Sequence, residues 1–331
     1  MPSLRRALRG LGMAIWTAAL PVALPAALPA AALAQAAIDP SVAPRAAALE
    51  RSGERALAID LLGRYLAVAP DDGQAWFQLG SFYLADARTW HQRGHSSEPP
   101  GPLYLDFAST ALEQAARLRI DSAPVLRGIV AAERAVVFVE ELGWSRARAA
   151  WLAERPAPLP PYVVELGMNL AGSCPQSGVL LTGGDLENTA VWYATLAIGH
   201  RADLLPLRPD LYATDAVYRG RMARTLGVDS ALSVQQALAS VRGRRAICLT
   251  PGADSAALPA AQWTPIRLVL VSRSATPPGD NVLSVADLLK ALKDEEEHWA
   301  RDVRDVYMSA ARRNPVLCDG VIRGLGERCG K

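Results

Sequence analysis

The sequence predicts an α/β protein with a helical first part and a small, mainly parallel sheet in its second part. Helical periodicity runs through residues 35–155, and a proline-rich linker follows at 156–163. Short apolar runs then alternate with helical segments through 164–331. This alternation is typical of a parallel sheet covered on both faces, here of about four strands. We expect helical hairpins, then this sheet, then a long C-terminal helix.

Residues 1–34 have the order of a secretory signal peptide. Three arginines precede an uncharged apolar stretch, and the small-x-small motif that ends at Ala34 predicts cleavage before Gln35. Three prolines interrupt the stretch, which argues against a membrane-spanning helix. An uncleaved N-terminal anchor is the alternative to a cleaved signal peptide. Gln35 in place of a cysteine argues against a lipoprotein. We therefore expect a periplasmic or secreted protein.

The charge balance gives no reason to expect nucleic acid or an anionic membrane as partner. The chain has 35 basic and 33 acidic residues, and removal of 1–34 would take away three arginines and no acid. The remaining chain is nearly neutral, so its net charge gives no electrostatic argument for such partners.

Four cysteines follow the predicted cleavage site: Cys174, Cys248, Cys318 and Cys329. An even number in an exported protein favours two disulfides, and four cysteines allow three pairings. Cys318 and Cys329 flank a short tail and could close a small loop, which would pair Cys174 with Cys248. No C-x-x-C motif occurs, which disfavours redox catalysis and a thiolate zinc site.

The helical part carries a tetratricopeptide repeat signature. Its four residues, in the order W-x2-L-G-x2-Y, are Trp76, Leu79, Gly80 and Tyr83. Pro70 stands where that repeat has its closing proline, and the small Gly80 would allow paired helices to approach closely. Such repeats usually present a groove to a peptide or protein.

The next repeat is predicted to be interrupted. Residues 88–102 are rich in Pro, Gly and Ser and are expected to form a loop, whereas 104–121 and 124–154 are expected to be helical. His91 and His95 have the H-x3-H spacing that could share a metal ion on a helix. Because the context is glycine-rich and no third ligand is evident, we expect solvated loop histidines and no metal.

The second part is expected to contain strands and helices in alternation. The predicted strands are 178–183, 202–208, 244–252 and 266–272, and the predicted helices are 186–199, 218–227, 234–241 and 284–315. Ser284 is expected to cap the last helix, with Asp287 completing a capping box, and Pro315 to end it.

Residues 183–204 resemble a block in the soluble region of the protein O-mannosyltransferase-like family of multi-pass membrane proteins. The residues in register are Gly184, Asp185, Trp192, Tyr193, Gly199, Arg201 and Asp203. The resemblance implies a periplasmic or lumenal region that carries tetratricopeptide-like helices. The Rossmann-like character of the sheet is expected from the alternation of strands and helices. Because that family's glycosyltransferase chemistry lies in its membrane part, no catalytic residue is implied for this chain.

The turn that begins this block has two interpretations. In the structural one, Asp185 caps the helix and Asp185 and Glu187 face the positive end of its dipole. In the functional one, Gly183, Gly184, Asp185, Glu187 and Asn188 form a ligand site at the carboxyl end of a strand. Two carboxylates there favour a divalent cation or sugar hydroxyls over an anion, and Asp203 and Asp215 could contribute.

No catalytic motif supports an enzyme, and catalytic residues remain unknown. The chain lacks G-x-S-x-G, Walker, G-x-G-x-x-G and H-E-x-x-H patterns. We therefore expect a non-enzymatic interaction or scaffolding protein of the bacterial cell envelope, without a cofactor, that binds a protein partner through its helical repeats. A carbohydrate-binding or carbohydrate-modifying protein using the turn is the alternative, and a self-associating structural subunit is a third.

Overall fold

The computed structural model describes residues 41–95, 100–257, 262–272, 283–293 and 298–325. The predicted signal peptide and Cys329 lie outside these ranges. Residues Pro40–Lys331 cluster as one compact unit. Within the described ranges, no helix combines the length and apolar character needed to cross a bilayer.

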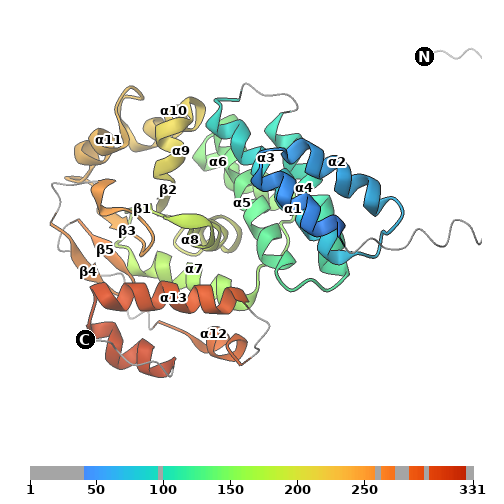
Figure 1. Ribbon diagram of the computed structural model, residues 1–331. Helices are drawn as coiled ribbons and strands as arrows, with labels where there is room; N and C mark the ends of the chain where they lie inside the picture. Colours follow the sequence, from blue (N-terminus) through green and yellow to red (C-terminus); the bar gives the residue numbers. More distant parts are fainter. Residues whose placement is uncertain (1–40, 96–99, 258–261, 273–282, 294–297, 326–331) are drawn as a thin grey trace, which may run out of the picture. The chain divides into compact units, whose positions relative to one another are not determined.

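The first part of this unit is helical, as expected. Its helices are α1 (Val42–Arg51), α2 (Arg55–Leu66), α3 (Gly73–Gln92), α4 (Gly101–Arg117), α5 (Ala123–Leu142) and α6 (Trp144–Ala153). Each helix packs against the next one along the chain, as the blue to green ribbons of Figure 1 show, and the contact between α3 and α4 is the most extensive. Asp72 begins α3 by accepting a hydrogen bond from the Ala75 N–H, at 2.9 Å.

The four signature residues lie on α3. A Cβ atom added to Gly80 would come within 2.6 Å of Leu112 Cγ, so a glycine is needed for α3 and α4 to approach this closely. The Trp76 indole donates a hydrogen bond to the Pro70 carbonyl, at 2.8 Å. These contacts tie the start of α3 to the turn before it.

The loop predicted for 88–102 is shorter than expected, because α3 continues to Gln92 and α4 begins at Gly101. The prediction gave most weight to the glycines and prolines of this segment. Trp90 and His91 are nevertheless buried, and their packing extends α3 beyond residue 88. Gly101 packs directly on Trp90, since a Cβ atom there would lie 2.3 Å from the Trp90 ring.

In the part of the chain that the structure describes, the sheet has five short strands in the order β2-β1-β3-β5-β4. They are β1 (Val179–Leu181), β2 (Leu205–Leu207), β3 (Ile247–Leu249), β4 (Thr264–Ile266) and β5 (Val269–Val271). β1 pairs in parallel with β2 and β3, whereas β5 pairs antiparallel with β3 and β4.

The sheet is therefore mixed instead of mainly parallel. The apolar run predicted as one strand over 266–272 is part of a tight hairpin, with a two-residue turn at Arg267 and Leu268. Arg267 has a φ of +49°, an unusual value for a residue other than glycine. The segment IRLVLVS contains no glycine, proline, asparagine or aspartate that would indicate this turn.

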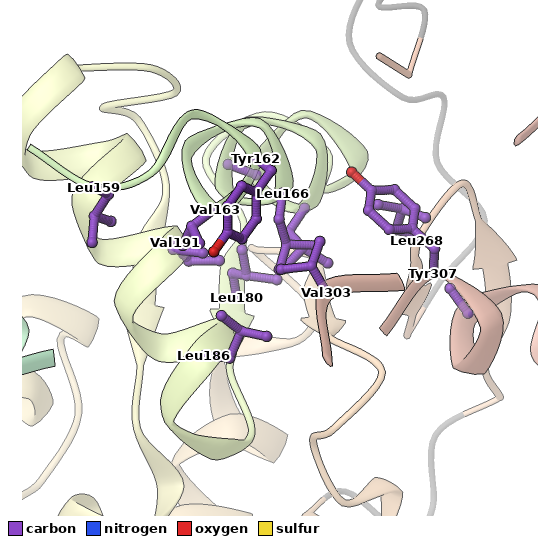
Figure 2. Packing of buried hydrophobic residues seen from close by; sticks show 14 of the residues in the cluster. Leu159, Tyr162, Val163, Leu166, Leu180, Leu186, Val191, Leu268, Val303 and Tyr307 are labelled. Carbon is purple, nitrogen blue, oxygen red and sulfur yellow. The ribbon is translucent and has the colours of Figure 1, made fainter. Parts of the chain in front are cut away.

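Helices cover both faces of the sheet. The remaining helices are α7 (Pro161–Ser173), α8 (Gly184–Trp192), α9 (Pro209–Thr214), α10 (Ala216–Leu226), α11 (Val234–Val241), α12 (Ala286–Ala291) and α13 (His298–Arg313), and a π-helical segment (Tyr193–Ile198) extends α8. Shorter helical turns occur at Ser255–Ala257 and Cys318–Ile322. Leu180 of β1 packs with α7 and α13 on one face, the cluster drawn in Figure 2, while Val179 and Leu181 pack with α10 and α11 on the other.

The expected long C-terminal helix is divided into α12 and α13. Ser284 is not the residue that caps α12. Instead, the buried Glu165 of α7 accepts hydrogen bonds from the Asp287 N–H (3.3 Å) and the Leu288 N–H (3.1 Å). A carboxylate from a distant helix thus satisfies the first turn of α12.

Cys174 and Cys248 form a disulfide, one of the pairings considered above. Cys174 follows α7 and Cys248 lies in the middle of β3, so the bond attaches α7 to the centre of the sheet. The predicted Cys318–Cys329 bond involves a residue outside the described ranges.

Candidate functional site

The turn after β1 is held by the close approach of two backbones. A Cβ atom on Gly183 would lie 2.1 Å from the backbone carbon of Gly252, in the loop after β3. Gly184 has a φ of +74°, which favours glycine. Both glycines of the candidate ligand site therefore have a structural reason to be there.

Glu187 and Asn188 are buried and already occupied within the protein. Glu187 accepts hydrogen bonds from the Thr250 hydroxyl and from the N–H groups of Gly252 (2.9 Å) and Gly183 (3.3 Å). Burial raises the pKa of its carboxyl group although these hydrogen bonds oppose the shift. Asn188 accepts a hydrogen bond from the Thr182 hydroxyl. These two side chains are buried, and Glu187 joins two loops of the sheet.

Asp185 is the accessible acid of the turn, with 48% of its side chain exposed. It does not cap α8: Gly183 occupies that position, and no side chain caps the helix. Asp185 instead forms an ion pair with Arg88 of α3, at 2.8 Å. The turn is thereby linked to the helical part of the molecule.

A row of alternating charges continues from this pair. Arg88 also contacts one oxygen of Glu133 on α5 (3.0 Å), and Arg208 contacts the other oxygen (2.7 Å) as well as Asp210 (3.0 Å). Glu133 is only 3% exposed. Burial alone would raise the pKa of its carboxyl group, but the two guanidinium groups outweigh it and lower that pKa.

Two adjoining cavities run along this row. The first, of about 440 Å³, is lined by residues of α2, α3, α5, α8 and α13, and the second, of about 450 Å³, by residues of α3, α5, α8 and α9 with Arg208. Both cavities are lined by Arg88, Gln92 and Asp185. We call the two together the cleft.

A cluster of four titratable side chains lies beside the second cavity: His91, His95, Glu140 and Asp215. The prediction of solvated loop histidines was wrong for His91, which is on the last turn of α3 and is 2% exposed. His95 does lie in the turn that follows α3. His95, with a φ of +65°, is 21% exposed and brings its ring back to the cluster. His91 belongs to the cluster and also lines the cleft.

Asp215 holds the cluster together. Its Oδ1 caps α10 by accepting the N–H groups of Val217 (2.8 Å) and Tyr218 (2.9 Å). Its Oδ2 lies 3.2 Å from His91 Nδ1 and 2.6 Å from His95 Nε2. Burial lowers the pKa of His91, but the neighbouring carboxylates of Asp215 and Glu140 outweigh it and raise that pKa to about 9.

The residues that carry the family resemblance hold a different loop. Arg201 donates to Asp203 (2.9 Å) and to the Cys174 carbonyl (2.7 Å), and Asp203 also accepts the Ser177 N–H (2.7 Å). Gly199 ends the π-helical segment with a φ of +75°. Trp192 is buried in the core. Asp203 therefore has its partners here, and only Asp215 of the two additional aspartates is near the cleft.

Sequence reasoning identified the two histidines and the turn but missed what connects them. Glu133, Glu140 and Arg208 gave no signal, because a single acid or base in an apolar helix or after a strand is usually a surface residue. Asp215, which contacts both histidines, lies 124 positions from His91 in the sequence. Only the packing of α3, α5 and α10 brings these groups together.

Comparisons with known proteins give no relative for this chain. No family model matches it, and no curated protein or solved structure matches it either. A function for this chain therefore rests on the geometry of the cleft and of the cluster beside it.

Proposed function

We propose that this chain is an exported, non-enzymatic interaction protein of the bacterial cell envelope, and that its partner binds in the cleft. The observation that carries this proposal is the composition of the cleft walls. One side comes from α3 and α5 of the helical part, and the other comes from α8, α9 and α13. Two cavities that share three residues suit an elongated ligand such as a peptide segment.

The chemistry of the walls favours a segment with an apolar side chain followed by polar groups. The first cavity combines Leu84, Leu126, Ile129 and Trp299 with the hydroxyl groups of Ser81 and Thr89. The second is lined mainly by charged groups, with Gln92 and Thr214 as neutral hydrogen-bonding residues. An apolar anchor in the first cavity and main-chain hydrogen bonds in the second would use both.

Finer features of the fold belong to the same proposal. We propose that α3 and α4 form a tetratricopeptide-like hairpin, which the contact of Gly80 with Leu112 and the hydrogen bond from Trp76 to Pro70 support. We propose a Rossmann-like origin for the parallel unit β2-β1-β3, which its covering helices support, in keeping with the resemblance to the mannosyltransferase-like family. The disulfide supports export to an oxidising compartment.

Site-specific photo-crosslinking in the native envelope tests this function. A photoreactive residue in place of Gln92, which is exposed and lines both cavities, should give a discrete adduct with one protein. The same residue in place of Gln235 is the matched control, because Gln235 is also an exposed glutamine on a helix but lies on α11. Identical adducts at both positions, or none at Gln92, would contradict the proposal.

A carbohydrate ligand is the alternative, and the exposure of Asp185 favours it. Asp185 lines both cavities, and its carboxylate with the amide of Gln92 could bind vicinal sugar hydroxyls. Glu187 and Asn188, which we also considered for this role, are engaged inside the protein. Envelope oligosaccharides that raise the melting temperature of the wild type but not of Asp185→Ala would favour this alternative over a protein partner.

A further inference from the structure

We infer that His91, His95, Glu140 and Asp215 form a binding site for one divalent transition-metal ion of the zinc class. This site goes beyond the proposed interaction function and does not depend on it. Each of the four side chains offers one donor atom, and the four donor atoms lie within 4.8 Å of one another.

The distances between the donors fit a tetrahedral ion. Ligands placed about 2.0–2.1 Å from a central Zn²⁺ are separated by roughly 3.3–3.4 Å. His91 Nδ1 lies 3.2 Å from Asp215 Oδ2 and 3.3 Å from Glu140 Oε1, and His95 Nε2 lies 2.6 Å from Asp215 Oδ2 and 3.7 Å from Glu140 Oε2. These separations lie on both sides of the tetrahedral value, and each oxygen of Glu140 faces one histidine.

Hydrogen bonds alone leave this cluster incompletely satisfied. His91 Nδ1 faces two carboxylate oxygens at nearly equal distances, but it carries at most one proton to donate. Glu140 Oε1 is buried and lies 3.3 Å from His91 Nδ1 without forming a hydrogen bond of normal geometry. A central cation would satisfy both imidazole nitrogens and both carboxylates at once.

The surroundings orient the donors as a metal site requires. The two N–H groups that bind Asp215 Oδ1 leave its Oδ2 directed at the histidines. The Trp90 ring stacks on the His95 ring, with the ring centres 3.9 Å apart and the planes 6° from parallel. Such supporting contacts fix ligand orientation in metal sites.

The donor set selects the class of metal. Two imidazole nitrogens and two carboxylates suit Zn²⁺ and similar ions such as Co²⁺, whereas Ca²⁺ and Mg²⁺ prefer more oxygen ligands and Cu⁺ prefers sulfur. Two carboxylates also neutralise a divalent charge, which burial requires. Because four protein ligands complete a tetrahedron, the ion would have a structural role and would fasten α3, α5 and α10 to one another.

Titration of the chelator-treated full-length protein with ZnCl₂ in a calorimeter tests the site. We expect one Zn²⁺ per chain, a higher melting temperature when Zn²⁺ is bound, and with Co²⁺ the intense visible absorption of a tetrahedral site. His95→Gln and Glu140→Gln, each first shown to be folded by circular dichroism, should bind Zn²⁺ roughly 100-fold more weakly or worse. His298→Gln removes an exposed histidine on α13 and should bind as the wild type does.

Two results would overturn the inference. One is the absence of saturable binding of a single Zn²⁺ by the folded wild type. The other is an affinity in either folded cluster variant that equals that of the wild type or of His298→Gln, because the ion would then bind elsewhere.

Discussion

At the scale of single residues, the turn after β1 depends on the absence of a side chain at Gly183. Any Cβ atom there would have to displace the backbone at Gly252, which cannot rotate away as a side chain could. Loss of the close approach of Gly183 to Gly252 would also disturb the hydrogen bonds by which Glu187 joins the loops after β1 and β3. Asp185 reaches Arg88 only because this turn holds its backbone in place.

We predict that Gly183→Ala lowers the free energy of unfolding by about 2–3 kcal/mol, the cost of overpacking a rigid site. Gly220→Ala is the matched control, because Gly220 lies inside α10 with open space around it. That control should be neutral or up to about 1 kcal/mol more stable, since alanine favours helix. Urea unfolding measures both variants, and equal effects would contradict this account of the turn.

Asp203 is predicted to make stability depend on pH. The hydrogen bond from Arg201, aided by the Ser177 N–H, lowers the pKa of Asp203 from 3.8 to about 2. A lowered carboxyl pKa adds stability that is complete above pH 3.8 and is lost as the pH falls through about 2. In urea unfolding, the advantage of the wild type over Asp203→Asn should therefore shrink on acidification. An advantage of the wild type that stays constant or grows on acidification would contradict the assignment.

At the scale of secondary structure, the local sequence pattern predicted correctly those elements whose ends are set by nearby residues. The segment 234–241 was predicted to be helical, and α11 has these bounds because Ser233 and Gln236 form a capping box at its start. The strands β1, β2 and β3 lie inside their predicted segments. The hairpin of β4 and β5 and the capping of α12 by Glu165 could not be predicted, because a positive φ and a contact between distant helices leave no local signature.

The disulfide is an element-scale constraint with a predictable effect on stability. Cys174 and Cys248 are 74 residues apart, and closing a loop of that length restricts the unfolded chain by about 4–5 kcal/mol. The double variant Cys174→Ala/Cys248→Ala should lose about this much free energy of unfolding in urea. Reduction of the wild type by dithiothreitol should have a similar effect, and a loss below about 1 kcal/mol in both would show that the bond constrains little.

At the scale of the whole molecule, the helical part and the sheet meet through charges as well as apolar packing. α5 contributes Glu133 to the row of ion pairs and Glu140 to the histidine cluster. The same helix belongs to the apolar core shared with the sheet. The sequence could indicate that the second part differs from the first. It could not indicate that α5 joins the two parts, because the acidic residues of α5 resemble those of any exposed helix face.

The metal site is the central claim of this account, because a bound ion would fasten α3, α5 and α10 at this junction. Anomalous X-ray diffraction at the zinc absorption edge, on crystals grown with Zn²⁺, tests it most directly. The account predicts one strong anomalous peak at bonding distance from His91 Nδ1, His95 Nε2, Glu140 and Asp215 Oδ2. A Zn²⁺ peak elsewhere with none at this position, or no peak at all, would show that the four side chains form only an ion-pair cluster.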